Sequence, residues 1–149
     1  MKPIFILNGP NLNLLGAREP EIYGSKTLAD IEADCRARAG ELGFKIEFRQ
    51  TNSEGTLVDW VQAAGAEARA LILNAGAYTH TSIALHDALK AIDILKLEVH
   101  LSNPAQREAF RHVSFVGSAS RGAITGLGPA GYLAALEAVK RLEAEGLSG

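Results

Sequence analysis

Side chains suited to acid–base chemistry and hydrogen bonding gather in one turn-rich stretch near the start of the chain. The stretch Asn8–Gly24 contains Arg18, Tyr23 and several amides and carboxylates, namely Asn8, Asn11, Asn13, Glu19 and Glu21. A guanidinium close to a phenol favours the phenolate by charge attraction, and a phenolate can act as a base. The competing interpretation is a solvated loop in which Arg18 pairs with a neighbouring glutamate, an interaction worth at most about 1 kcal/mol.

Amides and imidazoles also follow other apolar runs of the sequence. Asn8 and Asn11 follow the first run, Asn74 and His80 follow the third, and His100 closes the fourth. A turn or a helix cap would explain any one of these asparagines equally well. Taken together, the three strand ends indicate a shared polar site.

The segment after the fourth run adds a candidate anion site. Asn103–Pro104 has the residue types of a helix N-cap and first helical position, which would leave the backbone N–H groups of Leu101 and Ser102 available to a carboxylate or phosphate. Arg107 and Arg111 are four residues apart, so on the short helix predicted here they would share one face. A solvated helix face is the alternative interpretation of this arginine pair.

Strand-like and helix-like segments alternate along the whole chain, and these elements must position the polar residues. The predicted strands are Ile4–Leu7, Ile46–Arg49, Ala70–Leu73, Leu95–Val99 and Ala123–Thr125, and the predicted helices are Thr27–Leu42, Thr56–Glu67, Thr81–Ala91 and Gly131–Glu145. Mostly apolar strands that alternate with helices predict a flavodoxin-like, doubly wound α/β fold with a five-stranded parallel sheet. Such sheets bind ligands beyond the carboxyl ends of their strands.

Length and composition favour one domain over residues 1–149, since this length supports one well-covered core. The formal net charge is −2 and the basic residues are scattered, so we expect no nucleic-acid partner. Cys35 is alone and is interpreted as a small buried hydrophobe. We find no signal-peptide pattern and no apolar run of the roughly 18 residues that a membrane span needs, so we expect a cytoplasmic protein with no membrane partner.

Several familiar motifs fail in their context. The stretch Gly126–Gly131 matches G-x-G-x-x-G, but it follows the last predicted strand, so we interpret it as a tight turn into the last helix. The sequence has no Walker A pattern and no hydroxyl-rich loop for a flavin phosphate, so we expect no phosphate cofactor. The four histidines lack metal-ligand spacing, so we expect no metal. Asparagines occupy the positions where a receiver domain would need acidic residues.

Four motifs in order resemble the type II 3-dehydroquinate dehydratase family. They are Asn8-Gly9-Pro10-Asn11-Leu12-Asn13-Leu14-Leu15-Gly16 with Arg18-Glu19-Pro20 and Tyr23-Gly24, then Leu73-Asn74-Ala75-Gly76 with Thr79-His80-Thr81-Ser82, then Glu98-Val99-His100-Leu101-Ser102-Asn103, and finally Gly126-Leu127-Gly128 before Gly131-Tyr132. The resemblance covers essentially the whole chain. It implies a shikimate-pathway lyase that converts 3-dehydroquinate to 3-dehydroshikimate without metal or organic cofactor. It also implies a homododecamer built from trimers.

The resemblance assigns roles to residues at matching positions. Tyr23 corresponds to the base, Arg18 to the arginine that favours its phenolate, and Asn11 to the residue that stabilises the enolate through a water. His100 corresponds to the general acid. Glu98 lies two residues earlier, hence on the same side of a strand, and can orient that imidazole.

Further positions correspond to substrate-binding groups of the family. These are Asn74, His80, Arg111 and the backbone of Leu101 and Ser102, the last two holding a carboxylate, while Asp87 and Arg107 correspond to residues at or near the site. Two other classes stay open from the residues alone. One is a different cofactor-free enzyme on the same scaffold, such as an isomerase or hydrolase of a small polyhydroxylated acid, and the other is a non-catalytic ligand-binding domain.

Overall fold

A computed structural model of the chain, describing residues 1–17, 21 and 24–146, has a five-stranded sheet with the strand order β2-β1-β3-β4-β5. All the strand pairs are parallel. The strands are β1 (Ile4–Asn8), β2 (Ile46–Gln50), β3 (Ala70–Asn74), β4 (Leu95–His100) and β5 (Gly122–Thr125). The predicted parallel sheet is confirmed, and each strand extends one residue beyond its predicted bounds.

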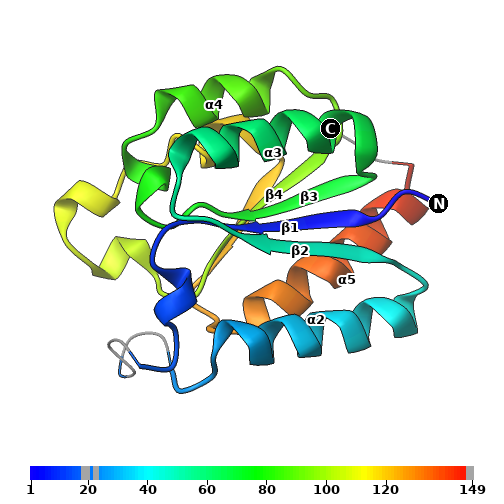
Figure 1. Cartoon of the computed structure of the whole chain (residues 1–149), viewed down its shortest axis with the longest axis horizontal. Helices are drawn as coiled ribbons and strands as arrows, with labels where there is room; N and C mark the ends of the chain where they lie inside the picture. Colours follow the sequence, from blue (N-terminus) through cyan, green and yellow to red (C-terminus); the bar gives the residue numbers. More distant parts are fainter. Residues whose placement is uncertain (18–20, 22–23, 147–149) are drawn as a thin grey trace.

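Helices cover both faces of the sheet (Figure 1). The helices α2 (Leu28–Leu42) and α5 (Ala130–Ala144) pack together on one face, and α3 (Glu54–Glu67) and α4 (Ile83–Lys90) pack together on the other. The doubly wound, flavodoxin-like arrangement is therefore confirmed.

The helices begin at side-chain caps that the local sequence supplies. The Thr27 hydroxyl accepts a hydrogen bond from the Asp30 N–H, and the Asp30 carboxylate accepts one from the Thr27 N–H, which is a complete capping box. The Ser53 hydroxyl caps α3 in the same way through the Thr56 N–H. This cap explains why α3 begins two residues before its predicted start.

The alternation of side chains along β1 divides the core into two clusters. Ile4 and Ile6 face α2 and α5, whereas Phe5 and Leu7 face α3 and α4. All four are at most 1% exposed, so the central strand is buried on both faces, as its apolar sequence predicts. Cys35 is also fully buried, and burial raises the pKa of its thiol to about 12, in agreement with a structural role.

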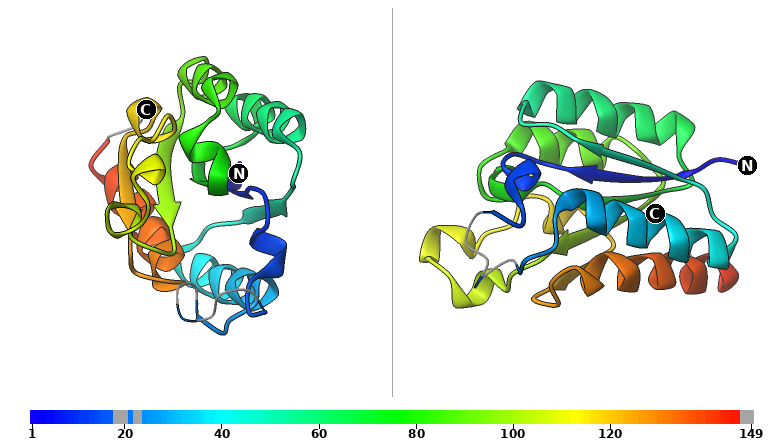
Figure 2. Two further views of the ribbon diagram at one scale, coloured as in Figure 1. Left: turned by 90° about the vertical axis from the view of Figure 1, so that its left-hand side faces the viewer. Right: turned by 60° about the horizontal axis from the view of Figure 1, so that its bottom comes forward.

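The carboxyl ends of the strands meet at one edge of the sheet, flanked by connecting segments (Figure 2). The 3₁₀ turn η1 (Leu12–Leu14) lies after β1, and η2 (Gly76–His80) lies after β3. The long connection between β4 and β5 carries three short turns, η3 (Pro104–Gln106), η4 (Ala109–Arg111) and η5 (Gly117–Ala119). The connections after β1, β3 and β4 all contribute to the pocket described below.

The prediction of one short helix carrying both Arg107 and Arg111 is wrong. Asn103 does cap the segment, since its side-chain oxygen accepts from the Ala105 N–H at 3.1 Å. The backbone at Arg107 is extended, however, and its carbonyl accepts from the His112 imidazole instead of continuing a helix. Two separate 3₁₀ turns replace the helix, and the bend between them brings both arginines to one pocket.

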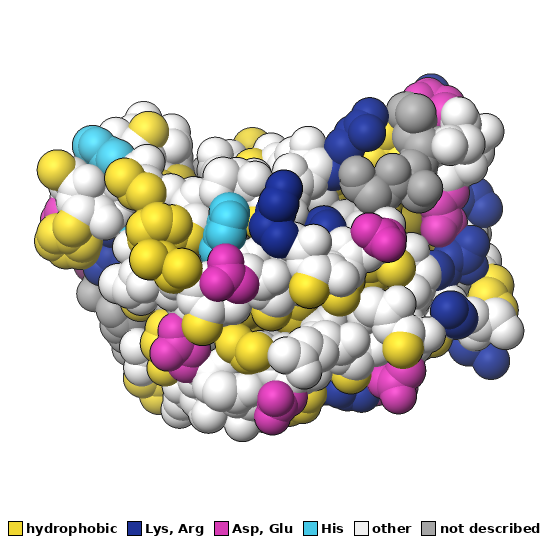
Figure 3. All heavy atoms as spheres, turned by 90° about the horizontal axis from the view of Figure 1, so that it is seen from above, with side chains coloured by type: hydrophobic (Ala, Val, Ile, Leu, Met, Phe, Trp, Pro, Cys, Tyr) yellow, Lys and Arg dark blue, Asp and Glu magenta, His cyan; other side chains and the backbone are white. Residues whose placement is uncertain are grey.

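On the face formed by α3 and α4, acidic, basic and apolar side chains are interspersed (Figure 3). Away from the β4–β5 connection, this pattern is typical of an ordinary solvated helix surface. None of the helices in the described part of the chain is long and apolar enough to cross a membrane.

Candidate active site

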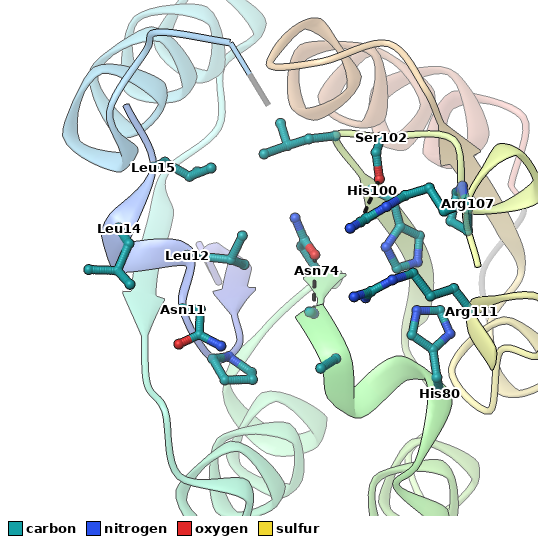
Figure 4. A pocket seen from close by; sticks show the side chains of 15 residues that line it. Asn11, Leu12, Leu14, Leu15, Asn74, His80, His100, Ser102, Arg107 and Arg111 are labelled. Atoms are coloured by element: carbon teal, nitrogen blue, oxygen red, sulfur yellow. Dashed lines mark hydrogen bonds between the residues drawn. The ribbon is translucent and has the colours of Figure 1, made fainter. Parts of the chain in front are cut away.

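A pocket opens at the carboxyl edge of the sheet, where the sequence predicts a site (Figure 4). Its volume is about 210 Å³, which suits a small organic acid. Its wall consists of Pro10, Asn11, Leu12, Leu14, Leu15, Asn74, Gly76, Ala77, His80, His100, Leu101, Ser102, Pro104, Arg107 and Arg111. The charged groups in this wall are two arginines, so the pocket favours an anionic ligand.

One side of the pocket presents groups that bind carboxylates. The guanidinium of Arg107 donates to the Ser102 hydroxyl at 3.3 Å, and the Nε of Arg111 donates to the exposed Glu108 at 2.6 Å. The carbonyls of Leu101 and Ser102 accept from the glycine turn that precedes α5. The turn and loop hydrogen bonds of the described residues include none donated by the N–H groups of Leu101 and Ser102, which leaves these N–H groups for a ligand.

A buried acid–imidazole pair lies at the pocket edge. The Nε2 of His100 is 2.6 Å from Glu98, whose carboxylate also accepts from the Ser114 hydroxyl at 2.5 Å. Burial by itself would raise the pKa of Glu98, but the hydrogen bonds from His100 and Ser114 outweigh it and the pKa is lowered. An ionised carboxylate can only accept, so Nε2 of His100 carries a hydrogen and Nδ1 is the nitrogen that remains for a ligand.

His80 stacks near this pair, with its ring centroid 6.3 Å from that of His100. Its Nδ1 is 2.8 Å from the Val113 carbonyl, which can only accept, so Nδ1 carries the hydrogen. Burial, followed by the nearby cationic groups, lowers the pKa of His80 against the opposing effect of this hydrogen bond. A neutral His80 therefore offers Nε2 as an acceptor.

Two asparagines complete the polar lining. Asn11 has a left-handed backbone with φ of 69°, a conformation that asparagine tolerates better than most residues, and its N–H donates to the Asn52 side chain at 3.0 Å. Asn74 lies at the centre of the pocket, where its side-chain oxygen accepts from the Gly76 N–H at 3.2 Å (Figure 4).

The structure brings most of the predicted site residues together. Asn11, Asn74, His80, His100, Leu101, Ser102, Arg107 and Arg111 all line the pocket, and Glu98 is in contact with His100. Asp87 does not line it, because it lies exposed on α4. Arg18 and Tyr23 lie outside the described residues. The described residues contain no group of three or more His, Cys, Asp or Glu side chains that could hold a metal ion.

Sequence reasoning missed Ser114, which donates to the Glu98 carboxylate, and Gly117, whose N–H donates to the Ser114 hydroxyl. Ser114 lies in an irregular connection with no recognisable pattern, so nothing in the sequence alone marks it. A Cβ on Gly117 would lie 2.7 Å from the Glu98 carboxylate, so only glycine permits this approach. The apolar wall residues Leu12 and Leu15 follow from their place in the first polar loop.

Comparisons with known proteins show the family of the chain. The sequence profile of the family described as dehydroquinase class II matches residues 2–140. The chain is 63% identical over 147 residues to a 3-dehydroquinate dehydratase of Hyphomonas neptunium, covering 99% of each chain, and 59% identical over 141 residues to that of Rhizobium etli, covering 95% of this chain and 97% of the relative. The crystal structure of a type II dehydroquinase from Propionibacterium acnes is similar with a TM-score of 0.91 and 42% identity, covering 95% of this chain and 97% of the other. The chain belongs to the class II dehydroquinase family.

Proposed function

We propose that this chain dehydrates 3-dehydroquinate to 3-dehydroshikimate, a reaction of the shikimate pathway that leads to the aromatic amino acids. The observation that carries the proposal is the buried Glu98–His100 pair at the edge of a cationic pocket, in a chain of this family. The pocket suits this substrate because it combines anion-binding groups with acceptors and donors for several hydroxyls.

The proposed reaction is an anti elimination through an enolate. A base takes a proton from the carbon next to the ketone, and the electron pair moves to the carbonyl oxygen. When the enolate collapses to form the carbon–carbon double bond, the hydroxyl leaves with a proton from His100 as water. One water is released and no electrons are gained or lost, so the step needs no redox partner.

The remaining roles follow the family resemblance. Tyr23 is the base and Arg18 favours its phenolate form, while Asn11 stabilises the developing enolate through a water. On the binding side, Arg111 and the N–H groups of Leu101 and Ser102 hold the carboxylate, with Arg107 beside them. Asn74 and His80 bind substrate oxygens.

Incubation with 3-dehydroquinate tests the proposal. The product is a conjugated enone, so growth of ultraviolet absorbance reports turnover, and a chelator such as EDTA should leave the rate unchanged. Tight binding without product would instead support a ligand-binding domain. Turnover of a related polyhydroxylated acid, with none of this substrate, would support another enzyme on the same scaffold.

We also infer a homododecamer built from trimers, as the resemblance implies. The exposed apolar side chains include Ile83 on α4 and Phe110 and Val113 on the projecting β4–β5 connection, each more than half exposed. Apolar side chains gather at that end of the α3–α4 face (Figure 3). Exposed groups of this kind favour contact with another chain.

In this assembly Asp87 contributes to the site of a neighbouring chain. The resemblance places it at or near a site, yet in its own chain it lies outside the pocket. Both statements hold if Asp87 contributes to the site of a neighbouring chain in the trimer.

A further inference from the structure

Two amides and a phenol form a buried hydrogen-bond network beneath the pocket. Asn8 ends β1, Asn74 ends β3 directly opposite it, and Tyr132 lies in the first turn of α5. The Nδ2 of Asn74 donates to the Tyr132 hydroxyl at 2.9 Å, and this hydroxyl donates to Oδ1 of Asn8 at 2.6 Å. All three residues are at most 3% exposed, so each of these groups depends on the others for hydrogen bonding.

Backbone groups at its two ends fix the direction of every hydrogen bond in this network. At one end the Asn8 side chain meets the Arg49 carbonyl at 3.0 Å, and a carbonyl can only accept, so Nδ2 of Asn8 faces it and Oδ1 faces Tyr132. Tyr132 must then give its hydrogen to Asn8 and accept from Asn74. At the other end the Gly76 N–H can only donate, so it requires Oδ1 of Asn74. The two ends impose the same direction independently.

This direction determines what Asn74 offers to the pocket. Its oxygen is engaged by Gly76 and one hydrogen of its Nδ2 by Tyr132, which leaves the second Nδ2 hydrogen. We propose that Tyr132 is a positioning residue that, with Asn8, locks the amide of Asn74 so that the pocket floor presents an N–H donor to a substrate oxygen. The identity of that substrate rests on the function proposed above, but the direction of the hydrogen bonds in the network does not.

Tyr132 stays a hydrogen donor under all ordinary conditions. Burial raises the pKa of its phenol well above the usual value, against the opposing effect of the Asn74 hydrogen bond. Tyr132→Phe would therefore remove the one group that accepts from Asn74 and donates to Asn8, while it keeps the packing of the ring. The Asn74 amide would then be held only through its oxygen by the Gly76 N–H at 3.2 Å, so its Nδ2 donor would no longer be fixed toward the ligand.

Steady-state kinetics with 3-dehydroquinate separate positioning from a purely structural role. We expect Tyr132→Phe to raise KM about five- to tenfold while kcat changes by less than about threefold, because a binding contact is lost equally from ground and transition states. Val139→Ala is the matched control, since Val139 is fully buried in the same helix and core cluster and has no polar partner. It should lower stability and leave KM within about twofold of the parent. An unchanged KM in Tyr132→Phe would overturn the proposal.

A double-mutant cycle tests whether Tyr132 acts through Asn74. In the Asn74→Ala background, Tyr132→Phe should change KM by less than about twofold. Fully additive effects would show that the hydroxyl acts by another route and would contradict the proposal.

Neutron diffraction from deuterium-exchanged crystals of the parent protein decides the direction without any assay. Deuterons on the Asn74 nitrogen that faces Tyr132, and a Tyr132 deuteron that points to Asn8, are the expected result. The opposite amide orientation would overturn the proposal, even if Tyr132→Phe fails to fold. If the parent protein does not turn over 3-dehydroquinate, only the proposed function is refuted, because the neutron experiment tests the hydrogen-bond direction separately.

Discussion

At the scale of single residues, the state of the Glu98 carboxylate decides how His100 can act. Its lowered pKa keeps Glu98 ionised at every pH above its ordinary value of 4.5, so it holds the hydrogen on Nε2 of His100. In the doubly protonated ring, Nδ1 then carries the proton that can be delivered to a leaving group. His80 is less available as a proton donor, because its lowered pKa leaves little of it protonated near neutral pH.

We therefore expect His100→Ala to lower turnover by about 10²–10⁴, the usual loss for a general acid, while the chain stays folded. Glu98→Gln should cause a smaller loss, since the amide can still orient the ring but lacks the charge. His86→Gln is the control, because His86 lies outside the pocket. Near-normal turnover of His100→Ala would show that His80 or a water molecule is the general acid instead.

The Glu98 carboxylate also predicts a pH effect on stability. A carboxyl group with a lowered pKa stabilises the fold fully above its unfolded value of about 4.5, and this contribution is lost as the pH falls through the folded value. Urea unfolding between pH 3 and pH 7 should therefore show a smaller acid loss of stability for Glu98→Gln than for the parent. Equal acid dependence in both proteins would contradict this assignment.

The phenol–guanidinium pair of the first loop remains a prediction from sequence. An unperturbed tyrosine has a pKa of about 10, so only about one molecule in a thousand carries the phenolate at neutral pH. Tyr23→Phe should nearly abolish turnover while KM stays within about tenfold of the parent, because only the base is lost. Arg18→Ala should impair turnover and shift the remaining alkaline rise of the rate to higher pH. A turnover rate of Arg18→Ala within a few fold of the parent, with an unchanged pH profile, would favour the solvated-loop interpretation.

At the scale of elements, the pocket depends on how closely two strand ends approach. A Cβ on Gly9 would lie 2.3 Å from the Ala75 carbonyl oxygen, so any side chain there must displace the start of η2 and with it the pocket wall. Gly9→Ala should lower both stability and turnover severely. Gly40→Ala in α2 meets no atom within 4 Å and should stabilise the fold by about 0.5–1 kcal/mol. Urea unfolding of both variants measures the contrast, and a harmless Gly9→Ala would show that the two strand ends can separate.

The same scale explains which elements the sequence could predict. Regular strands and helices follow from periodicity and caps, and their predicted bounds are nearly correct. The segment that carries Arg107 and Arg111 was mispredicted as one helix, because its course depends on a hydrogen bond from the His112 side chain. Local patterns do not encode such a contact. The four-residue spacing of the arginines did predict that they share a surface, although the helix on which that prediction relied is absent.

At the scale of the whole molecule, the parallel sheet explains why the predicted site could be assembled from distant segments. Polar residues at strand ends converge because all the strands point the same way, so the fold class alone predicts their proximity. The buried support of the site could not be predicted in this way. Asn8 and Tyr132 are separated by 124 positions in sequence, and only the packing of α5 against the sheet brings them together.

The proposed assembly supplies the last prediction, through the exposed position of Asp87 outside its own pocket. If Asp87 serves a neighbouring chain, Asp87→Ala and His100→Ala should each lower activity alone but complement each other in mixed oligomers. Random assortment of equal amounts would then leave about one quarter of the sites intact. Coexpression with two different affinity tags isolates the hybrids for assay, and sedimentation reports their size.

A mixture of His100→Ala with Glu98→Gln is the matched control for these hybrids. Both residues belong to one chain's site, since their side chains are in direct contact. A mixed oligomer of these two variants therefore contains no site with both residues intact and should gain no activity beyond that of the Glu98→Gln chains. If the Asp87→Ala hybrids form and show no gain either, Asp87 does not act across an interface. A stable, fully active monomer in sedimentation would refute the assembly itself.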